Sequence, residues 1–261
     1  MGHTNDPASQ AGGRPRVCLV IPCYNEAHRL DVASFRRFLD EHPGTVLIFV
    51  DDGSRDETVS VLERVRDGHD SAVEILRLAK NGGKADAVRA GIVHALDGLE
   101  PTMVGFWDAD LATPLASVEA LAQILERQPE IEMVFGARVK LLGRHVERRA
   151  VRHYLGRLFA TLVSGTLNLP IYDSQCGAKL FRVTPQTRKI FAERFLSKWV
   201  FDVEILARYL VMSGGDPKRL ERMVYEYPLE VWTDVAGSKV AAKDFFTALL
   251  DIVRIRFKYL S

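Results

Sequence analysis

The sequence predicts an α/β fold in which a mostly parallel sheet is flanked by helices. Short runs of β-branched and aromatic residues alternate with longer amphipathic stretches in the first half of the chain. Such runs are typical of strands buried on both faces, and strand–helix alternation is typical of a doubly wound sheet. The predicted strands are Val17–Ile21, Val46–Val50, Val73–Leu78, Met103–Trp107 and Met133–Gly136.

Helices are predicted wherever apolar residues recur at helical spacing between these strands. Asp56 and Thr113 stand where helix-capping residues are common. The second half is less regular, with strands expected at Ala178–Val183 and Met223–Val231. The predicted helices are Val32–Glu41, Glu57–Arg66, Lys84–Leu96, Leu115–Arg127, Arg149–Leu167, Val203–Met212 and Lys239–Leu260.

The composition is that of an ordinary globular protein. Its 261 residues are 47% hydrophobic and 26% charged, and a net charge of +1 gives no reason to expect nucleic-acid binding. No run approaches the ~18 apolar residues that span a bilayer. We expect residues 1–15 to be a disordered tail and 16–261 to be one domain, with halves at 16–136 and 137–261. Core packing is expected for Cys18 and Cys23, which bracket an apolar run, and three cysteines without CxxC spacing favour a reduced, cytosolic compartment.

Polar residues follow the predicted strands, at the sheet edge where open α/β folds bind ligands. Pro22–Glu26 offers an aromatic ring, an amide and a carboxylate, a set that suits a base and a ribose. Asp51–Ser54 offers further carboxylates beside Gly53, which permits a tight turn. Taken alone, each of these loops is more typical of turn and helix-capping chemistry.

Asp108 and Asp110 leave the end of the fourth predicted strand at positions i and i+2. Two carboxylates so spaced can turn toward one ion, and their oxygens suit Mg²⁺ or Mn²⁺ bound together with substrate phosphates. Lys84 adds a cation at a predicted helix N-terminus on the same rim. These residues predict a divalent-metal site for a phosphorylated ligand.

Three of these motifs in this order resemble glycosyltransferase family 2, an inverting family with the GT-A fold. Pro22–Glu26 is similar to the family's PxYNE, Asp51–Thr58 to DDGS-x-D-x-T, and Asp108–Asp110 to its DxD metal motif. Family members usually carry N-x-G-K-G, whereas Asn81–Ala85 reads NGGKA. We interpret that departure as a local difference in helix packing.

Motifs in the second half narrow the resemblance to the dolichyl-phosphate β-glucosyltransferases. Trp232–Asp234 stands where the related mannosyl synthases carry an arginine, which favours the glucosyl branch. The resemblance covers residues 17 to 260. The motifs that carry it are Gly136–Arg138, Asp173–Gly177, Phe201–Glu204 and Gly237–Lys239.

The resemblance implies a metal-dependent, inverting hexosyltransferase that moves glucose from UDP-glucose to a polyprenyl phosphate. Residues 16–136 would then bind the nucleotide sugar and 137–261 the acceptor. The catalytic group would be Asp108, Asp110 and Arg138, with Mg²⁺ or Mn²⁺ on the two acids. The implied nucleotide contacts are Pro22, Tyr24, Asn25, Glu26, Asp52, Lys84 and Asp108. The implied sugar contacts are Asp173, Gln175, Trp199, Asp202 and Glu204. The implied contacts to the acceptor phosphate are Arg138, Ser238 and Lys239.

The acceptor decides whether a base is needed. A phosphate monoester, with a second pKa of about 6, is largely a dianion near neutrality and needs cations instead of a general base. A hydroxyl acceptor would make Asp173, Asp202 and Glu204 the candidate bases. From the residues alone, Arg138 is more typical of a surface ion pair and Lys239 of a solvated helix end.

A basic stretch over residues 138–157 leads into an apolar helix face, a pattern that suits an anionic lipid surface. The C-terminal helix either lies at a membrane interface or caps the sheet with its apolar stripe. We expect a helical, membrane-facing acceptor part and peripheral attachment to the cytoplasmic face of a membrane. The stripe comprises Phe246, Leu250, Val253, Phe257 and Leu260.

Three alternatives stay open at this point. The donor can be GDP-mannose, or the acceptor a soluble hydroxyl compound. In a different class, the chain is a nucleotide-binding protein without catalysis, against which the intact Asp108 and Asp110 argue. The sequence also leaves open a membrane-protein partner or a homo-oligomer.

Overall fold

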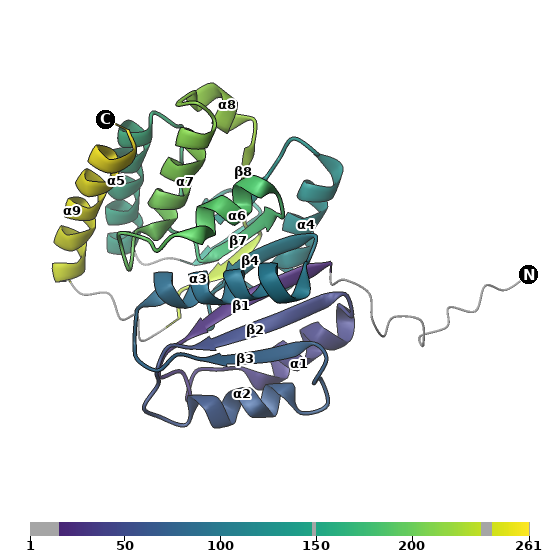
Figure 1. The fold of residues 1–261 in the computed structure, drawn as a ribbon. Coiled ribbons are helices and arrows are strands. Elements are labelled where there is room, and N and C mark those ends of the chain that lie inside the picture. The colour runs from purple at the N-terminus through teal and green to yellow at the C-terminus, as the bar shows by residue number, and fades with distance from the viewer. Residues whose placement is uncertain (1–15, 148–149, 236–241, 261) are drawn as a thin grey trace, which may run out of the picture.

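The computed structural model describes residues 16–147, 150–235 and 242–260. Within these ranges the chain forms a seven-stranded sheet with helices on both faces (Figure 1). A separate two-stranded sheet pairs β6 (His145–Glu147) with β9 (Val231–Thr233). In order across the large sheet, the strands are β3 (Val73–Arg77), β2 (Thr45–Asp51), β1 (Val17–Cys23), β4 (Met103–Trp107), β7 (Ala178–Arg182), β5 (Met133–Ala137) and β8 (Val224–Pro228).

The predicted parallel sheet is confirmed for β1 to β4, and the five strands predicted in the first half end within two residues of the observed bounds. Strand β7 runs antiparallel to both β4 and β5, a direction that no local pattern indicates. The strand predicted at Met223–Val231 is interrupted at Leu229–Glu230 and becomes β8 and the start of β9.

Side-chain alternation along β1 explains the two layers of core. Val17, Leu19 and Ile21 pack on one face, and Cys18 and Val20 on the other. The first face is covered by α1 (Val32–Glu41), α2 (Thr58–Arg66) and α4 (Ser117–Arg127). The second face is covered by α3 (Lys84–His94) with its π-helical extension η2 (Ala95–Leu99), α6 (Pro185–Ala192) and α7 (Phe201–Met212). Helices α5 (Ala150–Leu167) and α9 (Ala242–Tyr259) both contact α7.

Two short helices were not predicted: α6, and α8 (Pro217–Glu221). Both begin with a capping residue followed by proline, Thr184 before α6 and Asp216 before α8, so the signal was present in the sequence. The capping role predicted for Thr113 is wrong, because α4 begins later and the Thr113 carbonyl accepts a hydrogen bond from the Trp107 indole.

Cys18 and Cys23 are buried, as predicted, and Cys176 is buried too. Across the described ranges, no helix combines the length and apolar character needed to cross a membrane.

Candidate active site

The loops that follow β1, β2 and β4 meet at the carboxyl edge of the sheet, because these strands are parallel neighbours. The loop after β1 is tied to the loop after β2. Ser54 Oγ accepts from the Asn25 backbone at 2.9 Å, and Thr58 Oγ1 accepts from the Glu26 backbone at 2.8 Å. The residues of the DDGSRDET segment thus hold the neighbouring loop in place.

Asn25 contributes to this same attachment. Its backbone φ of 51° lies in the left-handed region that asparagine tolerates, and its side-chain oxygen accepts from the Arg55 backbone at 2.8 Å. The Asn25 side-chain oxygen therefore has a structural partner, and the predicted nucleotide contact of this residue stays a prediction. Pro22 and Tyr24, which precede it, keep partly exposed side chains at the sheet edge.

Asp52 turns toward the loop that precedes α3. Its carboxylate accepts from the backbone of Gly82 at 2.7 Å and of Gly83 at 2.8 Å. Burial raises the pKa of Asp52, and these two amides oppose the shift. Gly83 has a φ of 96°, which favours glycine, and Lys84 follows as the first residue of the helix. Asp52, predicted to contact the nucleoside, holds the turn that presents Lys84.

The acid pair at the end of β4 faces outward. The Asp108 and Asp110 side chains are 39% and 26% exposed. Lys84 Nζ lies 2.5 Å from Asp108 Oδ1, and an Arg29 terminal nitrogen lies 3.1 Å from Asp110 Oδ2. Burial, with the nearby Asp108 charge, raises the pKa of Asp110. The sequence prediction brought Lys84 and the two acids together but missed Arg29.

The two carboxylates suit a divalent ion. They project from positions i and i+2 with accessible oxygens, and Mg²⁺ and Mn²⁺ bind such oxygens together with water and phosphate. Gly177 makes room for the first of them, since a Cβ there would lie 1.9 Å from Asp108 Oδ2. Among the described residues, no group of three or more His, Cys, Asp or Glu gathers into a metal cluster.

Arg138 and Asp173 form a two-pronged ion pair beside this site. Arg138 Nε and one terminal nitrogen lie 2.5 and 2.7 Å from the Asp173 oxygens, and the Arg138 backbone also donates to Asp173. The guanidinium lies 5.4 Å from the centre of the Trp232 ring. Glu226 accepts from the backbone of both Tyr172 and Asp173, so it orients this segment. The sequence offered no motif that marks Glu226.

Comparison with known proteins identifies the family. The family described as Glycosyl transferase family 2 matches residues 18–186. The chain belongs to glycosyltransferase family 2. The dolichyl-phosphate beta-glucosyltransferase of Dictyostelium discoideum is 33% identical over 262 residues, covering 94% of this chain and 75% of the relative. The protein of that name from Saccharomyces cerevisiae is 32% identical, and the one from Homo sapiens 31%.

Solved structures confirm the predicted GT-A fold. Glucosyl-3-phosphoglycerate synthase from Mycobacterium tuberculosis, crystallised with Mn²⁺, UDP-glucose and phosphoglyceric acid, superposes with a TM-score of 0.66. The match covers 95% of this chain and 82% of the synthase at 16% identity. At that identity the likeness establishes the shared fold alone.

A buried ion pair lies behind the site of this family 2 glycosyltransferase. Lys179 Nζ lies 2.7 Å from Asp202 Oδ1 and donates to the carbonyls of Ser174 and Cys176. Asp202 is 4% exposed, so its carboxylate faces Lys179 inside the protein. Asp202 also acts on Lys84. Burial disfavours the charged form of Lys84, but the negative charges of Asp108 and, next, of Asp202 raise the pKa of Lys84. Sequence reasoning missed Lys179, which stands in the predicted strand Ala178–Val183.

Glu204, a predicted sugar contact, is fully buried among the C-terminal helices. Its carboxylate binds Arg208, the Tyr259 hydroxyl and the Leu196 backbone. The structure therefore does not bring Glu204 together with the acid pair.

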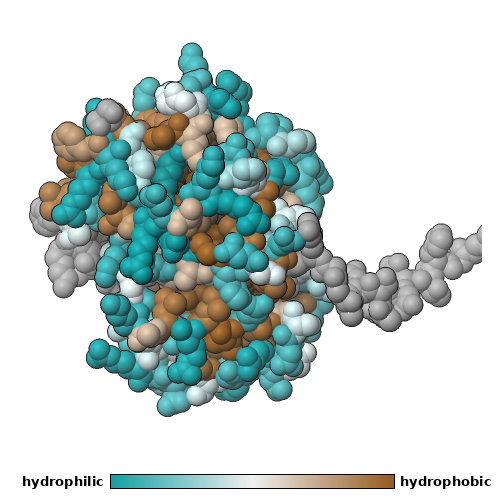
Figure 2. Space-filling model, in the orientation of Figure 1, coloured by the Kyte–Doolittle hydropathy of each residue, from teal (hydrophilic) through white to brown (hydrophobic). Residues whose placement is uncertain are grey.

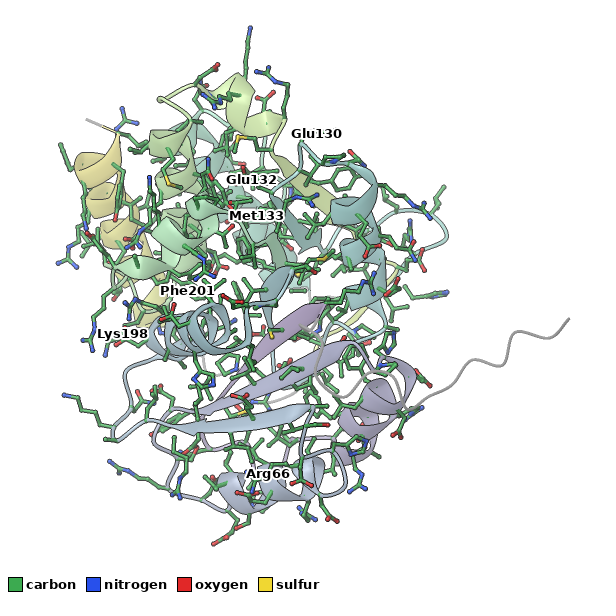
Figure 3. The ribbon with its side chains drawn as sticks, turned by 45° about the vertical axis from the view of Figure 1, so that its right-hand side comes forward. Arg66, Glu130, Glu132, Met133, Lys198 and Phe201 are labelled. Carbon is green, nitrogen blue, oxygen red and sulfur yellow. The ribbon has the colours of Figure 1, made fainter. Side chains whose placement is uncertain are left out.

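The remaining sugar and acceptor candidates differ in position. Gln175 Nε2 is buried and has no hydrogen-bond partner among the described residues. Trp199 is 44% exposed. The residue before it, Lys198, packs against Gly83. In Figure 3, Lys198 and Phe201 lie beside α3. Ser238 and Lys239 lie outside the described residues.

Proposed function

We propose that this family 2 glycosyltransferase moves glucose from UDP-glucose to a polyprenyl phosphate of the dolichyl type, with Mg²⁺ or Mn²⁺ at its acid pair. The observation that carries the proposal is the outward-facing Asp108–Asp110 pair at the carboxyl end of β4, with Lys84 beside it. The names of the most similar relatives support the glucose donor and the lipid phosphate. The Mn²⁺ in the synthase crystals supports a divalent ion.

Asp108 and Asp110 would hold the ion, which when bound neutralises charge on the departing nucleotide phosphate. Lys84 lies at the N-terminus of α3, where an ammonium and helix amides together favour the donor diphosphate. Tyr24 and Pro22 would cover the uracil, and Glu26 would bind the nucleoside. These groups fix the donor and its leaving group.

The acceptor side needs cations, since a phosphate dianion attacks without a base. Arg138 keeps one terminal nitrogen outside its pairing with Asp173, and that nitrogen can donate to a phosphate. Ser238 and Lys239 would complete the phosphate contacts. Asp173 thereby aims Arg138 at the acceptor as well as standing near the sugar.

The sugar would meet Asp173, Gln175 and Trp199. The unpartnered Gln175 amide supports such a contact, because a buried donor without a partner costs free energy that a ligand hydroxyl would recover. Asp202 and Glu204, both enclosed, would act only by supporting their surroundings.

An exposed apolar face on α5 and α9 supports peripheral attachment to a membrane, for which we propose the cytoplasmic face. Among the described side chains of α9, Ala248, Ile252 and Ile255 pack inward and Leu260 contacts the core, so only part of the apolar stripe packs inside the protein. Figure 2 shows brown patches among teal ones over the region that α9 occupies in Figure 1. Of the side chains that the structure describes, the exposed apolar ones on this face are Leu158, Leu162, Leu250, Val253 and Phe257, and the exposed cations of α9 are Arg254, Arg256 and Lys258.

Three cations of the basic stretch predicted for this role contact other residues of the protein. Arg138 pairs with Asp173, Arg144 pairs with Glu230, and Arg157 lies over the Tyr172 ring. On α5, Phe159 and Val163 face the core. Because these cations of the basic stretch already have partners, the exposed cations of α9 would be the ones that contact anionic lipid.

The deciding experiment offers UDP-glucose, GDP-mannose and other nucleotide sugars to the purified protein with Mn²⁺ and a short-chain prenyl phosphate, and reads the lipid by mass spectrometry. We expect glucosyl phosphoprenol from UDP-glucose alone, and none from the Asp110→Ala variant or after chelation. Transfer from GDP-mannose would replace the donor, and transfer that survives chelation would refute the metal site. In a parallel reaction with a soluble hydroxyl compound in place of the prenyl phosphate, glucosylation of that compound would replace the acceptor.

A further inference from the structure

Arg29 links the nucleotide loop to the acid pair. One terminal nitrogen lies 3.1 Å from Asp110 Oδ2 and the other 3.4 Å from Glu26 Oε2. The side chain is 24% exposed, and its Nε is buried without a hydrogen-bond partner among the described residues. Its backbone donates to the Glu26 carbonyl at 2.9 Å, which fixes where the side chain starts. A partly buried arginine shared by two acids differs from a solvated surface ion pair.

Each acid of the pair has a cation of its own. Lys84 pairs with Asp108, and Arg29 is shared between Asp110 and Glu26, so two cations already stand beside the acid pair. A divalent ion that enters alone brings two positive charges close to these two cations. The same ion entering with a nucleotide diphosphate brings no net positive charge, and the diphosphate gives Lys84 a second partner.

Within the proposed function, we infer that Arg29 is a counterion that occupies Asp110 in the free protein and makes tight ion binding depend on the nucleotide diphosphate. Asp110 would hold the ion once Arg29 releases it, and the guanidinium would stay on Glu26, its second partner. Arg29 is then a positioning residue, which acts on the ion through Asp110 and on the nucleoside loop through Glu26.

The test measures Mn²⁺ binding to the full chain from the free-Mn²⁺ electron paramagnetic resonance signal, with and without UDP. In the unchanged protein, UDP should tighten Mn²⁺ binding by about tenfold or more. Arg29→Met should tighten binding of Mn²⁺ alone by about fivefold or more and shrink the effect of UDP. Adding Asp110→Asn to Arg29→Met should remove that gain.

Arg36→Met is the matched control, because Arg36 lies on α1 and contacts Arg64 and Asp67. Arg36→Met should bind Mn²⁺ as the unchanged protein does. Arg29→Lys, which keeps the positive charge, should have an Mn²⁺ affinity close to that of the unchanged protein. If Arg29→Met is poorly folded by circular dichroism, Arg29→Gln takes its place. Equal or weaker binding of Mn²⁺ alone to the neutral variants overturns the inference. Failure of the unchanged protein to bind Mn²⁺ even with UDP overturns the proposed function itself.

Discussion

Lys84 Nζ lies 2.5 Å from Asp108 Oδ1, so the first residue of α3 and the first acid after β4 form one ion pair at the sheet edge. On the other side of Asp108 lies Gly177, whose carbonyl accepts from the Asp108 backbone at 3.0 Å. The acid is therefore held between a cation and a glycine that leaves it space.

The space at Gly177 gives the first prediction. In Gly177→Ala the new Cβ would approach Asp108 Oδ2 to 1.9 Å, so the carboxylate must shift. We expect Mn²⁺·UDP affinity and turnover to fall about tenfold or more, with a stability cost of about 1–3 kcal/mol from overpacking. Calorimetric titration and urea unfolding measure these effects.

Gly165→Ala is the control for that substitution. Gly165 is an exposed residue of α5 with no atom in the way of a Cβ, and alanine favours helix by about 0.5–1 kcal/mol. This variant should be as active as the unchanged protein and slightly more stable. Equal behaviour of the two alanine variants would show that Asp108 does not need its present position.

The sequence predicted the parts of the site that lie next to strand ends. Apolar runs such as Met103–Trp107 locate a buried strand, and the residues after a parallel strand must reach the carboxyl edge of the sheet. Asp108, Asp110 and Lys84 were found in this way. The same logic did not foresee that side-chain oxygens of Asn25 and Asp52 accept hydrogen bonds from turns of the protein itself.

The residues that were missed depend on partners distant in sequence. Arg29 and Asp110 are 81 positions apart, and no periodicity relates them. Lys179 resembles an ordinary outward-facing lysine of a strand until β7 is placed between β4 and β5, which encloses its ammonium. Strand order and direction are tertiary properties, so these contacts required the structure.

The enclosed pair of Lys179 and Asp202 gives the second prediction. Lys179→Met would leave a buried carboxylate without its cation, which costs about 3–5 kcal/mol of unfolding free energy. Combining it with Asp202→Asn should recover much of that loss, since the charge that needed a partner is gone. Urea unfolding of the single and double variants measures the coupling, and simple addition of the two losses would argue against it.

Glu226 gives the third prediction. In Glu226→Gln one oxygen becomes an amide donor facing the Tyr172 and Asp173 backbone, which loosens Asp173 and with it Arg138. We expect KM for the prenyl phosphate to rise several-fold while kcat changes less. Glu230→Gln, at an exposed acid paired with Arg144, should leave both constants unchanged. Indistinguishable kinetics of the two variants would remove Glu226 from the acceptor site.

The fourth prediction concerns pH. Burial, together with the Asp108 charge, raises the pKa of Asp110, so a proton occupies this carboxylate at a higher pH than in an ordinary aspartate. Because the ion requires the ionised form, Mn²⁺ affinity measured with UDP-glucose, whose diphosphate gains no proton near neutrality, should fall with falling pH, and the fall should begin at a higher pH than an ordinary aspartate would give. Asp110→Asn should bind weakly and lack this step. A fall that begins no higher than an ordinary aspartate allows would contradict the raised pKa.

The exposed face of α9 gives the last prediction. Leu250 and Phe257 are 61% and 71% exposed, and each apolar side chain inserted into lipid contributes about 1.5 kcal/mol, which is roughly tenfold in binding. Leu250→Ser with Phe257→Ser should therefore release the protein from phosphatidylglycerol-containing vesicles in a sedimentation assay, while activity on a water-soluble short-chain prenyl phosphate persists. Tyr225→Ser, which removes an exposed ring from β8, should sediment like the unchanged protein. If the double variant also stays on the vesicles, this face does not contact the membrane.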